Sequence, residues 1–271
     1  MRRLLDLVLG VSLNRLEDKY AVVCEKVDLD GVPAEIISSR SSSARTLLYL
    51  HGGGYFMGSL LADRANAAKI AIHCDARVAI IDYRLAPENP YPAALEDAVR
   101  GYRELKRRDP GRKVIICGDS AGGGLALALG LYLRDHGLPA PAGIFCISPW
   151  TDLTGSGRSV YENRRRDVWL TKKHIDFWGP WYFGTQSPRL PYVSPVFGDF
   201  RGFSPLLLLV GDQEVLLDDA RRVAESAKSV GVDVDLHLGS GMQHNWMLAM
   251  PFLGESKIAW TRISKFVASI E

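Results

Sequence analysis

Cysteine is scarce in this sequence of 271 residues, and the four that occur lie far apart. They are Cys24, Cys74, Cys117 and Cys146, with no Cys-x-x-Cys pair and no neighbouring histidine at zinc-ligand spacing. This spacing excludes the common zinc modules and a disulfide scaffold. We expect buried free thiols, which are typical of a reducing compartment. Cysteine usage therefore favours a cytoplasmic protein.

An excess of charge of either sign is also lacking. The 33 lysines and arginines nearly balance the 31 aspartates and glutamates, which leaves a net charge of +2. Two short basic runs, at 106–108 and 164–166, fit solvated faces better than a binding surface. The charge pattern therefore predicts no nucleic-acid partner.

Long apolar runs are absent as well, because no stretch approaches the roughly 18 residues that a membrane span needs. The N-terminus starts like a signal peptide, but Asp6 interrupts its apolar run and no small-residue cleavage site follows. Its apolar residues instead recur at helical spacing, at Leu5, Val8, Leu9, Leu13 and Leu16. We therefore predict an amphipathic N-terminal helix and no membrane partner.

The sequence does contain an alternation of short apolar runs and helical stretches, in a composition that is 47% hydrophobic and 24% charged. Two strands, at 20–28 and 32–39, are joined by the turn pair Asp30-Gly31. Further strands are expected at 46–50, 77–82, 113–117, 143–148, 206–210 and 233–238, and helices at 59–73, 93–108, 121–136, 216–229 and from Glu255 onward. This order predicts an α/β fold with a doubly wound, mostly parallel sheet of eight strands that opens with an antiparallel pair.

The segment at 152–192 interrupts this alternation. It is rich in aromatic residues, namely Trp169, Phe177, Trp178, Trp181, Tyr182 and Phe183. It follows the carboxyl end of a predicted strand, which is the edge of an α/β sheet where ligands bind. We expect a lid over a site, although the aromatic residues could also serve only to pack the insertion onto the body.

The sequence Gly118-Asp119-Ser120-Ala121-Gly122 matches Gly-x-Ser-x-Gly and lies between a predicted strand and a predicted helix. That context is the one the motif requires, because a sharp strand-to-helix turn raises the serine hydroxyl above the sheet and needs small flanking residues. The helix that follows favours negative charge near its N-terminus. Ser120 is therefore the candidate nucleophile.

Three consecutive glycines follow another strand in His51-Gly52-Gly53-Gly54-Tyr55. Bare backbone at this edge can bring N–H groups close to an oxyanion, together with the N–H of Ala121. The alternative of a phosphate-binding loop lacks both common glycine patterns for that purpose.

A serine nucleophile needs a base, and in this arrangement the base comes late in the chain, after an acid. His244 fits, because it follows the last strand in a loop from which its side chain can reach Ser120. The other histidines are expected to support the glycine loop or to lie in helices and a strand; they are His51, His73, His136, His174 and His237.

Four acids follow the strand at 206–210, namely Asp212, Glu214, Asp218 and Asp219. The last two lie about a helical turn further on and point less readily at the site. Asp212 is the usual residue type, but it is close to the strand end and could cap the loop instead. One of these carboxylates is expected to orient His244 and to stabilise its imidazolium.

Three long motifs in this order resemble the bacterial hormone-sensitive-lipase-like esterases of the α/β-hydrolase fold. They are His51-Gly52-Gly53-Gly54-Tyr55, then Asp82-Tyr83-Arg84-Leu85-Ala86-Pro87-Glu88 with Pro92-Ala93-Ala94, and Gly118-Asp119-Ser120-Ala121-Gly122-Gly123. The resemblance runs from the glycine loop to the C-terminus. It implies a carboxylesterase in which the register of 211–219 selects Glu214 as the acid. Most members have Asp there, so Asp212 and Asp218 remain in reserve.

The resemblance also implies an oxyanion hole formed by Gly53, Gly54 and Ala121. It implies one domain spanning 1–271, with a cap built from 1–19 and 152–192; the early glycine loop shortens the N-terminal half of that cap. Tyr55, Asp119 and Trp150 are expected to contact the substrate.

The predicted function is hydrolysis of short-chain acyl esters through an acyl-enzyme, with activity rising through about pH 6 to 7 as the histidine base loses its proton. A lactone hydrolase, an amide hydrolase or a deacetylase of a small molecule would use the same residues. A non-catalytic receptor on the same fold is a further alternative, whereas the serine argues against a carboxylate-nucleophile hydrolase. The mechanism implies no cofactor or metal. A homodimer through the last strand is expected, since open sheet edges favour pairing.

Overall fold

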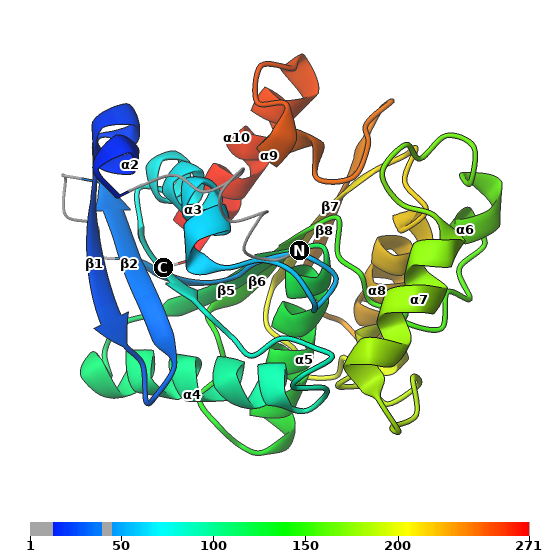
Figure 1. Cartoon of the computed structure of the whole chain (residues 1–271), viewed down its shortest axis with the longest axis horizontal. Coiled ribbons are helices and arrows are strands. Elements are labelled where there is room, and N and C mark those ends of the chain that lie inside the picture. The colour runs from blue at the N-terminus through cyan, green and yellow to red at the C-terminus, as the bar shows by residue number, and fades with distance from the viewer. Residues whose placement is uncertain (1–12, 40–44, 271) are drawn as a thin grey trace.

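The computed structural model describes residues 13–39 and 45–270, and in them eight strands form one sheet (Figure 1). The strand order is β1-β2-β4-β3-β5-β6-β7-β8. The strands are β1 Val22–Asp28, β2 Pro33–Ser39, β3 Thr46–Leu50, β4 Arg77–Ile81, β5 Val114–Asp119, β6 Gly143–Ile147, β7 Leu206–Gly211 and β8 Val234–Gly239. Strand β2 runs antiparallel to both of its neighbours, and the six strands from β4 to β8 in this order are parallel. The predicted sheet and its antiparallel opening pair are confirmed.

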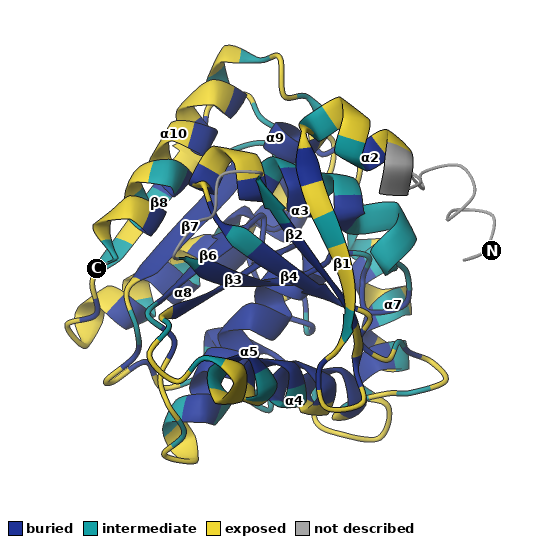
Figure 2. Ribbon diagram, turned by 90° about the vertical axis from the view of Figure 1, so that its left-hand side faces the viewer, coloured by how far each residue is buried: buried dark blue, intermediate teal, exposed yellow. Residues whose placement is uncertain are grey.

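Helices cover both faces of the sheet (Figure 1). The helices α4 Ala93–Arg108, α5 Ala121–Asp135 and α8 Leu217–Ser229 pack in one hydrophobic cluster, and α3 Leu60–Cys74, α9 Trp246–Ala249 and α10 Gly254–Ser269 pack in the other. The central strands are dark blue along their whole length in Figure 2, since both of their faces are covered. This explains why their sequences are nearly continuous apolar runs.

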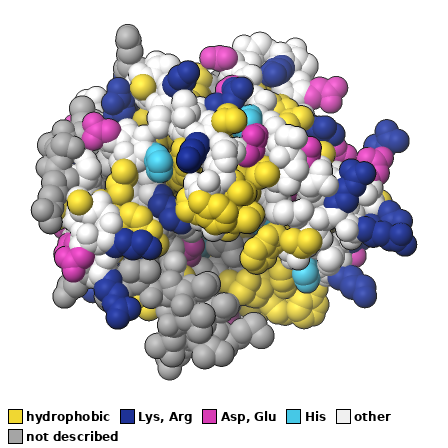
Figure 3. Space-filling model, turned by 90° about the horizontal axis from the view of Figure 1, so that it is seen from above, with side chains coloured by type: hydrophobic (Ala, Val, Ile, Leu, Met, Phe, Trp, Pro, Cys, Tyr) yellow, Lys and Arg dark blue, Asp and Glu magenta, His cyan; other side chains and the backbone are white. Residues whose placement is uncertain are grey.

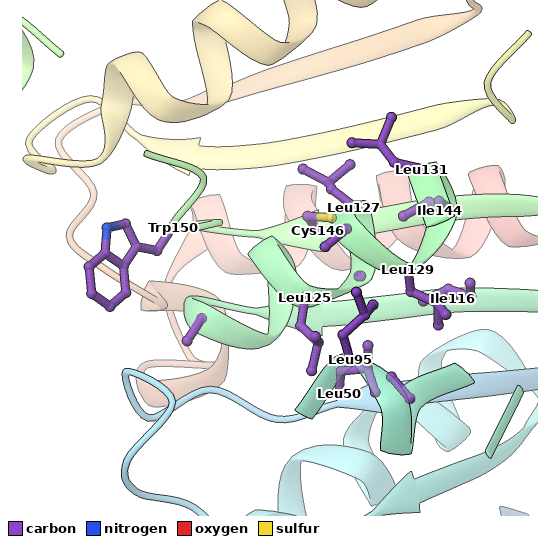
Figure 4. Close-up of a cluster of buried hydrophobic side chains, with 14 of the residues drawn as sticks. Leu50, Leu95, Ile116, Leu125, Leu127, Leu129, Leu131, Ile144, Cys146 and Trp150 are labelled. Atoms are coloured by element: carbon purple, nitrogen blue, oxygen red, sulfur yellow. The ribbon is translucent and has the colours of Figure 1, made fainter. Parts of the chain in front are cut away.

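Strand ends set the position of the site. In Figure 4, leucine and isoleucine side chains fill the space between α5 and the sheet, whereas Trp150 lies apart from them, beyond the end of β6. It follows Ser148, which is buried and has a φ of 46°, so the chain turns sharply as it leaves the sheet. The segment after β6 therefore starts at the carboxyl edge, where loops of several strands meet.

The cap segment, residues 152–192, contains α6 Ser159–Glu162 and α7 Lys172–Phe183. The aromatic residues of α7 pack onto the glycine loop: Tyr182 stacks on Tyr55 with ring centroids 3.6 Å apart, and Trp178 lies 5.0 Å from Phe56. The side chain of Phe177 is 59% exposed. The face of the molecule that is seen from above carries a patch of hydrophobic side chains (Figure 3). The aromatic residues of the segment thus serve both to pack it and to line its underside.

The predicted N-terminal part of the cap is described only from Leu13 onward. There, α2 Leu13–Tyr20 packs against α3 and β1, with Leu16 fully buried. The predicted helix residues before Leu13 lie outside the described residues.

Two smaller predictions are wrong. Cys24 is only half-buried on the edge strand β1, while the other three cysteines are buried, and all four are free thiols. His136 lies just past the end of α5 rather than within it. Among the helices that the structure describes, none is long and apolar enough to cross a membrane.

Candidate active site

Ser120 stands at the turn between β5 and α5 in a strained conformation, with φ 54° and ψ −123°. The glycines around it are required by close backbone contacts. A Cβ on Gly122 would lie 2.0 Å from the carbonyl oxygen of Leu50, and one on Gly118 would lie 2.2 Å from the carbonyl oxygen of Gly122. The strained turn places the Ser120 hydroxyl at the carboxyl edge of the sheet, as the motif predicts.

An unbroken chain of hydrogen bonds links this hydroxyl to a buried carboxylate. The Ser120 hydroxyl lies 3.0 Å from Nε2 of His244, and Nδ1 of His244 lies 2.9 Å from Oε2 of Glu214. Because a carboxylate only accepts, Nδ1 carries the proton and Nε2 is left to accept from the serine. The structure thus brings together Ser120, His244 and Glu214, which the sequence singled out from three separate parts of the chain.

Glu214 is completely buried, and both of its oxygens have partners. Its Oε1 accepts from the hydroxyl of Ser148 at 2.7 Å and from the N–H of Gly211 at 2.6 Å, which leaves Oε2 for His244. Ser148 also accepts from the N–H of Asn245, the residue after the histidine. These bonds fix the carboxylate and the histidine loop relative to each other.

The other three acids have different partners. Asp212 accepts from the N–H of Gly241 and from Gln213, and so ties together the loops after β7 and β8. Asp218 accepts from the N–H of Ser159, and Asp219 accepts from the N–H groups of residues 151 and 152. Asp212 therefore has the loop-capping contacts that were its alternative role, while Asp218 and Asp219 hold the start of the cap segment.

Two buried residues of the cap segment reinforce this connection, and no sequence motif indicates either of them. Asn163 donates to the carbonyl oxygens of Asp212 and Glu214, and Asp167 accepts from the N–H of Val215 at 2.8 Å. Isolated polar residues in a loop carry no sequence signal for such a role. These hydrogen bonds tie the cap segment to the loop after β7, which carries Glu214.

The environment of His244 favours its charged form. Burial lowers its pKa, but the hydrogen bond to Glu214 and the negative charges of Glu214, Asp167 and Asp119 raise it by more. The pKa of His244 therefore lies above the usual value for histidine. A base with such a carboxylate partner is suited to accept a proton from a serine hydroxyl.

The glycine loop presents backbone donors beside Ser120. Gly53 and Gly54 have φ values of 110° and 62°, which side chains rarely tolerate. In the part of the chain that the structure describes, the N–H groups of Gly53, Gly54 and Ala121 donate to no other group. These three donors can serve an oxygen that becomes negatively charged above Ser120.

Asp119 holds this loop from below and does not line the cavity above Ser120. Its carboxylate accepts from Tyr49, from the N–H of Gly52 at 3.0 Å and from Asn245 at 2.7 Å. These contacts give Asp119 a positioning role, because its two oxygens accept from three donors. Its contact with substrate stays a prediction. Asn245 and Tyr49 were not found from the sequence, since neither belongs to a motif.

His51 supports the same loop, as expected. Its buried ring stacks on Tyr83 at 4.3 Å, and its Nδ1 donates to the carbonyl oxygen of Gly52. Tyr55 is also buried, between α7 and the sheet edge, and does not line the cavity. Its ring stacks on that of Tyr182, and its contact with substrate stays a prediction.

A small cavity of about 30 Å³ lies over Ser120. Trp150, for which the sequence predicts a substrate contact, is one of the residues that line it, and the cap segment supplies much of the wall. The lining residues are Gly54, Ser120, Trp150, Leu170, His174, Ile175, Trp178 and Leu216. A nucleophile, a base, an orienting acid and free N–H donors thus surround an apolar space, an arrangement suited to acyl transfer.

The chain is similar in sequence to known proteins. The family described as the α/β-hydrolase fold matches residues 47–248. An acetyl-hydrolase of Streptomyces hygroscopicus is 41% identical over 228 residues, which cover 83% of this chain and 76% of the relative. An esterase of Acinetobacter venetianus is 35% identical over 251 residues, covering 90% and 82%.

The structure is also similar to solved ones. The crystal structure of an esterase from the bacterial hormone-sensitive lipase family superposes with a TM-score of 0.91 at 40% identity, covering 99% of this chain and 90% of the other. A hormone-sensitive lipase from a metagenome library superposes with a TM-score of 0.88 at 33% identity, covering 99% and 97%.

Proposed function

The chain belongs to the α/β-hydrolase fold family and to its bacterial hormone-sensitive-lipase branch, and on this premise we propose that it is a serine carboxylesterase. One observation carries the proposal: Ser120, His244 and Glu214 form a continuous hydrogen-bonded chain next to three free backbone N–H groups. The named activities of the relatives, acetyl-hydrolase and esterase, support the same reaction class.

The proposed reaction starts with attack of the Ser120 oxygen on the ester carbonyl carbon, while its proton passes to Nε2 of His244. The carbonyl oxygen becomes an oxyanion that accepts from the N–H groups of Gly53, Gly54 and Ala121. As this intermediate collapses, the bond to the alcohol oxygen breaks, and His244 returns the proton to the leaving alcohol. The acyl group stays on Ser120.

Water completes the cycle by the same steps in reverse order. His244 takes a proton from a water molecule as the water oxygen attacks the acyl-enzyme, and it returns that proton to Ser120 when the acid leaves. Glu214 keeps its charge throughout and stabilises the imidazolium. The raised pKa of His244 follows from this same stabilisation of its charged form.

We propose short acyl groups as substrates because of the size of the cavity. Trp150, Leu170 and Trp178 wall this small cavity of about 30 Å³, and their side chains limit the length of the acyl chain that fits beside Ser120. Longer chains would require Trp178 or Leu170 to move. Lactones, amides and acetylated small molecules are compatible with the same residues, and the acetyl-hydrolase relative favours acetyl esters among them.

The test is hydrolysis of p-nitrophenyl acetate, butyrate, octanoate and laurate by the wild type and by Ser120→Ala. We expect activity to fall with chain length and to vanish in the variant. A folded wild type that hydrolyses none of these esters and resists a serine-reactive phosphonate would favour a non-catalytic receptor instead.

We also propose a cytoplasmic location, which the four free thiols support. Fractionation of the source cells, with detection by antibody, tests this: recovery with the periplasmic or secreted proteins would contradict it.

A further inference from the structure

Asn245 directly follows the base His244 and has an unusual backbone conformation. Its φ of 55° and ψ of 29° lie in the left-handed region, which asparagine tolerates better than most residues that have a side chain. In this conformation its backbone N–H donates to the hydroxyl of Ser148 at 3.1 Å, and Ser148 donates in turn to Glu214. The backbone of Asn245 is therefore joined to the carboxylate that orients the base.

The side chain of Asn245 is joined to another part of the site. Its amide nitrogen donates to Oδ2 of Asp119 at 2.7 Å, and Oδ1 of Asp119 accepts from the N–H of Gly52 at 3.0 Å. Because a carboxylate only accepts, the amide must present its nitrogen to Asp119. Asp119 precedes Ser120, and Gly52 begins the glycine run that carries two of the proposed oxyanion donors. One residue thus links the base loop, the nucleophile turn and the glycine loop.

Stability alone does not explain an asparagine at this position. Among the described residues, the amide oxygen of Asn245 is buried and has no hydrogen-bond partner. A buried acceptor without a partner destabilises a fold, and so does a left-handed conformation at a residue other than glycine. Local strain at the residue next to the base points to a functional role.

We infer that Asn245 is a positioning residue: by donating to Asp119, it fixes His244 relative to the nucleophile turn and the glycine loop. It is not among the residues that line the cavity over Ser120, so it acts through Asp119 and His244. The site requires its hydrogen-bond donor rather than its size. The inference rests on the proposed esterase function, because that reaction needs the base and the oxyanion donors in one fixed geometry.

Two substitutions separate the donor from the backbone conformation. Asn245→Gly adopts the left-handed conformation without strain and retains the backbone N–H, but it removes the donor to Asp119. Asn245→Asp retains the size and places a second carboxyl group against Asp119. Two carboxylates in contact do not readily both ionise, so one proton is shared between them and serves as the donor until rising pH removes it. Asp30→Gly is the matched control, because it makes the same change at an exposed residue with a φ of 59° in the turn between β1 and β2.

The ionisable groups around Asp119 are the same in the wild type and in Asn245→Asp. Those that interact with the charge of Asp119 are Tyr49, Asp63, Tyr83, Cys117 and His244. A pH dependence that occurs only in Asn245→Asp therefore comes from the added carboxyl group.

The measurement is kcat and KM for p-nitrophenyl acetate from pH 6 to 9, each expressed relative to the wild type at the same pH. We expect Asn245→Gly to lower kcat by about tenfold to a hundredfold at every pH, as a misplaced base predicts, with KM within about threefold. For Asn245→Asp, the relative kcat should be close to that of the wild type at pH 6 and should fall by about tenfold toward pH 9, as the shared proton is lost. Asp30→Gly should match the wild type throughout.

The outcomes separate the two proposals. Wild-type kcat in a folded Asn245→Gly variant overturns the positioning role and leaves the esterase function standing. A relative kcat of Asn245→Asp that does not change with pH does the same, and this result decides alone if Asn245→Gly does not fold. A wild type that hydrolyses no ester overturns the proposed function, and with it the inference.

Discussion

At the scale of a single residue, the two carboxylate oxygens of Glu214 have different hydrogen-bond partners. One oxygen accepts hydrogen bonds from the hydroxyl of Ser148 and the N–H of Gly211, and the other accepts a hydrogen bond from Nδ1 of His244. We expect Glu214→Gln to lower kcat by about 10³- to 10⁴-fold, because a neutral amide neither fixes the tautomer nor stabilises the imidazolium. Steady-state kinetics on p-nitrophenyl acetate measures the effect.

The neighbouring acids provide the control for this assignment. Asp212→Asn retains an oxygen that can accept from the N–H of Gly241, so its kcat should stay within about threefold of wild type. A loss in Asp212→Asn as large as that in Glu214→Gln would show that the triad acid is not Glu214.

The pH dependence of the reaction follows from the surroundings of His244. The base must be neutral to accept a proton, and its pKa is raised, chiefly by the hydrogen bond and charge of Glu214 acting against burial. As pH falls through that raised pKa, His244 becomes protonated and kcat/KM falls. We therefore expect the acid limb above about pH 6.5, the usual pKa of histidine.

A pH profile of kcat/KM from pH 5 to 9 tests this expectation. Glu214→Gln removes the charge that raises the pKa, so the limb of its residual activity should move to lower pH. A limb at or below pH 6.5 in the wild type, or full activity at pH 5, would contradict the assignment.

The sequence allows some of these residues to be predicted and not others, for a physical reason. Ser120 and the glycine loop are set by backbone geometry that only certain local sequences permit, whereas Glu214 is selected by the resemblance of 211–219 to the acid motif of the family. Asn163 and Asn245 act through contacts with distant loops. Such contacts depend on the packing of the whole fold, and nothing in the adjacent sequence indicates them.

The strand-to-helix turn between β5 and α5 depends on a close approach of two elements. Gly122 lies against the end of β3, where an added Cβ would meet the carbonyl oxygen of Leu50 at 2.0 Å. We expect Gly122→Ala to reduce the free energy of unfolding by about 3 kcal/mol or more, even though alanine favours helix by about 1 kcal/mol. Thermal unfolding should show a Tm lower by at least about 6 °C.

Gly111 offers the matched comparison, because a Cβ there meets nothing within 4 Å. Gly111→Ala should change the unfolding free energy by less than about 0.5 kcal/mol. Equal Tm values for Gly122→Ala and the wild type would show that the turn can relax, and that the glycine is not required.

The cap segment shows the limit of prediction at the scale of an element. Its length and aromatic content were visible in the sequence, and its position after β6 indicated a lid. The sequence did not indicate that only 159–162 and 172–183 are helical, or that Trp178 faces inward while Phe177 stays exposed. Neighbouring aromatic residues on a helix point in different directions, and the packing partner decides which of them is covered.

The sheet of the whole molecule ends at β8, which has β7 as its only neighbour among the described strands. The N–H of Asp212 donates to the carbonyl oxygen of Gly239, so the backbone of Gly239 faces β7. Because the backbone groups of successive residues in a strand point to opposite sides, the N–H and C=O groups of Leu238 and Leu236 point away from β7. Leu238 is also 37% exposed. Open backbone groups with an apolar side chain beside them favour pairing with another strand.

We therefore expect two copies of this chain to pair through β8, as predicted from the sequence. Light scattering on the wild type should give about twice the chain mass of 29.9 kDa. Leu238→Pro removes an outward N–H and Leu238→Lys places a charge at the edge, so both should shift the protein to the monomer. Val23→Lys, at the opposite edge of the sheet, is the control that should leave the dimer intact. A wild-type monomer at working concentration, or a dimer that survives both Leu238 variants, would show that β8 is not the contact.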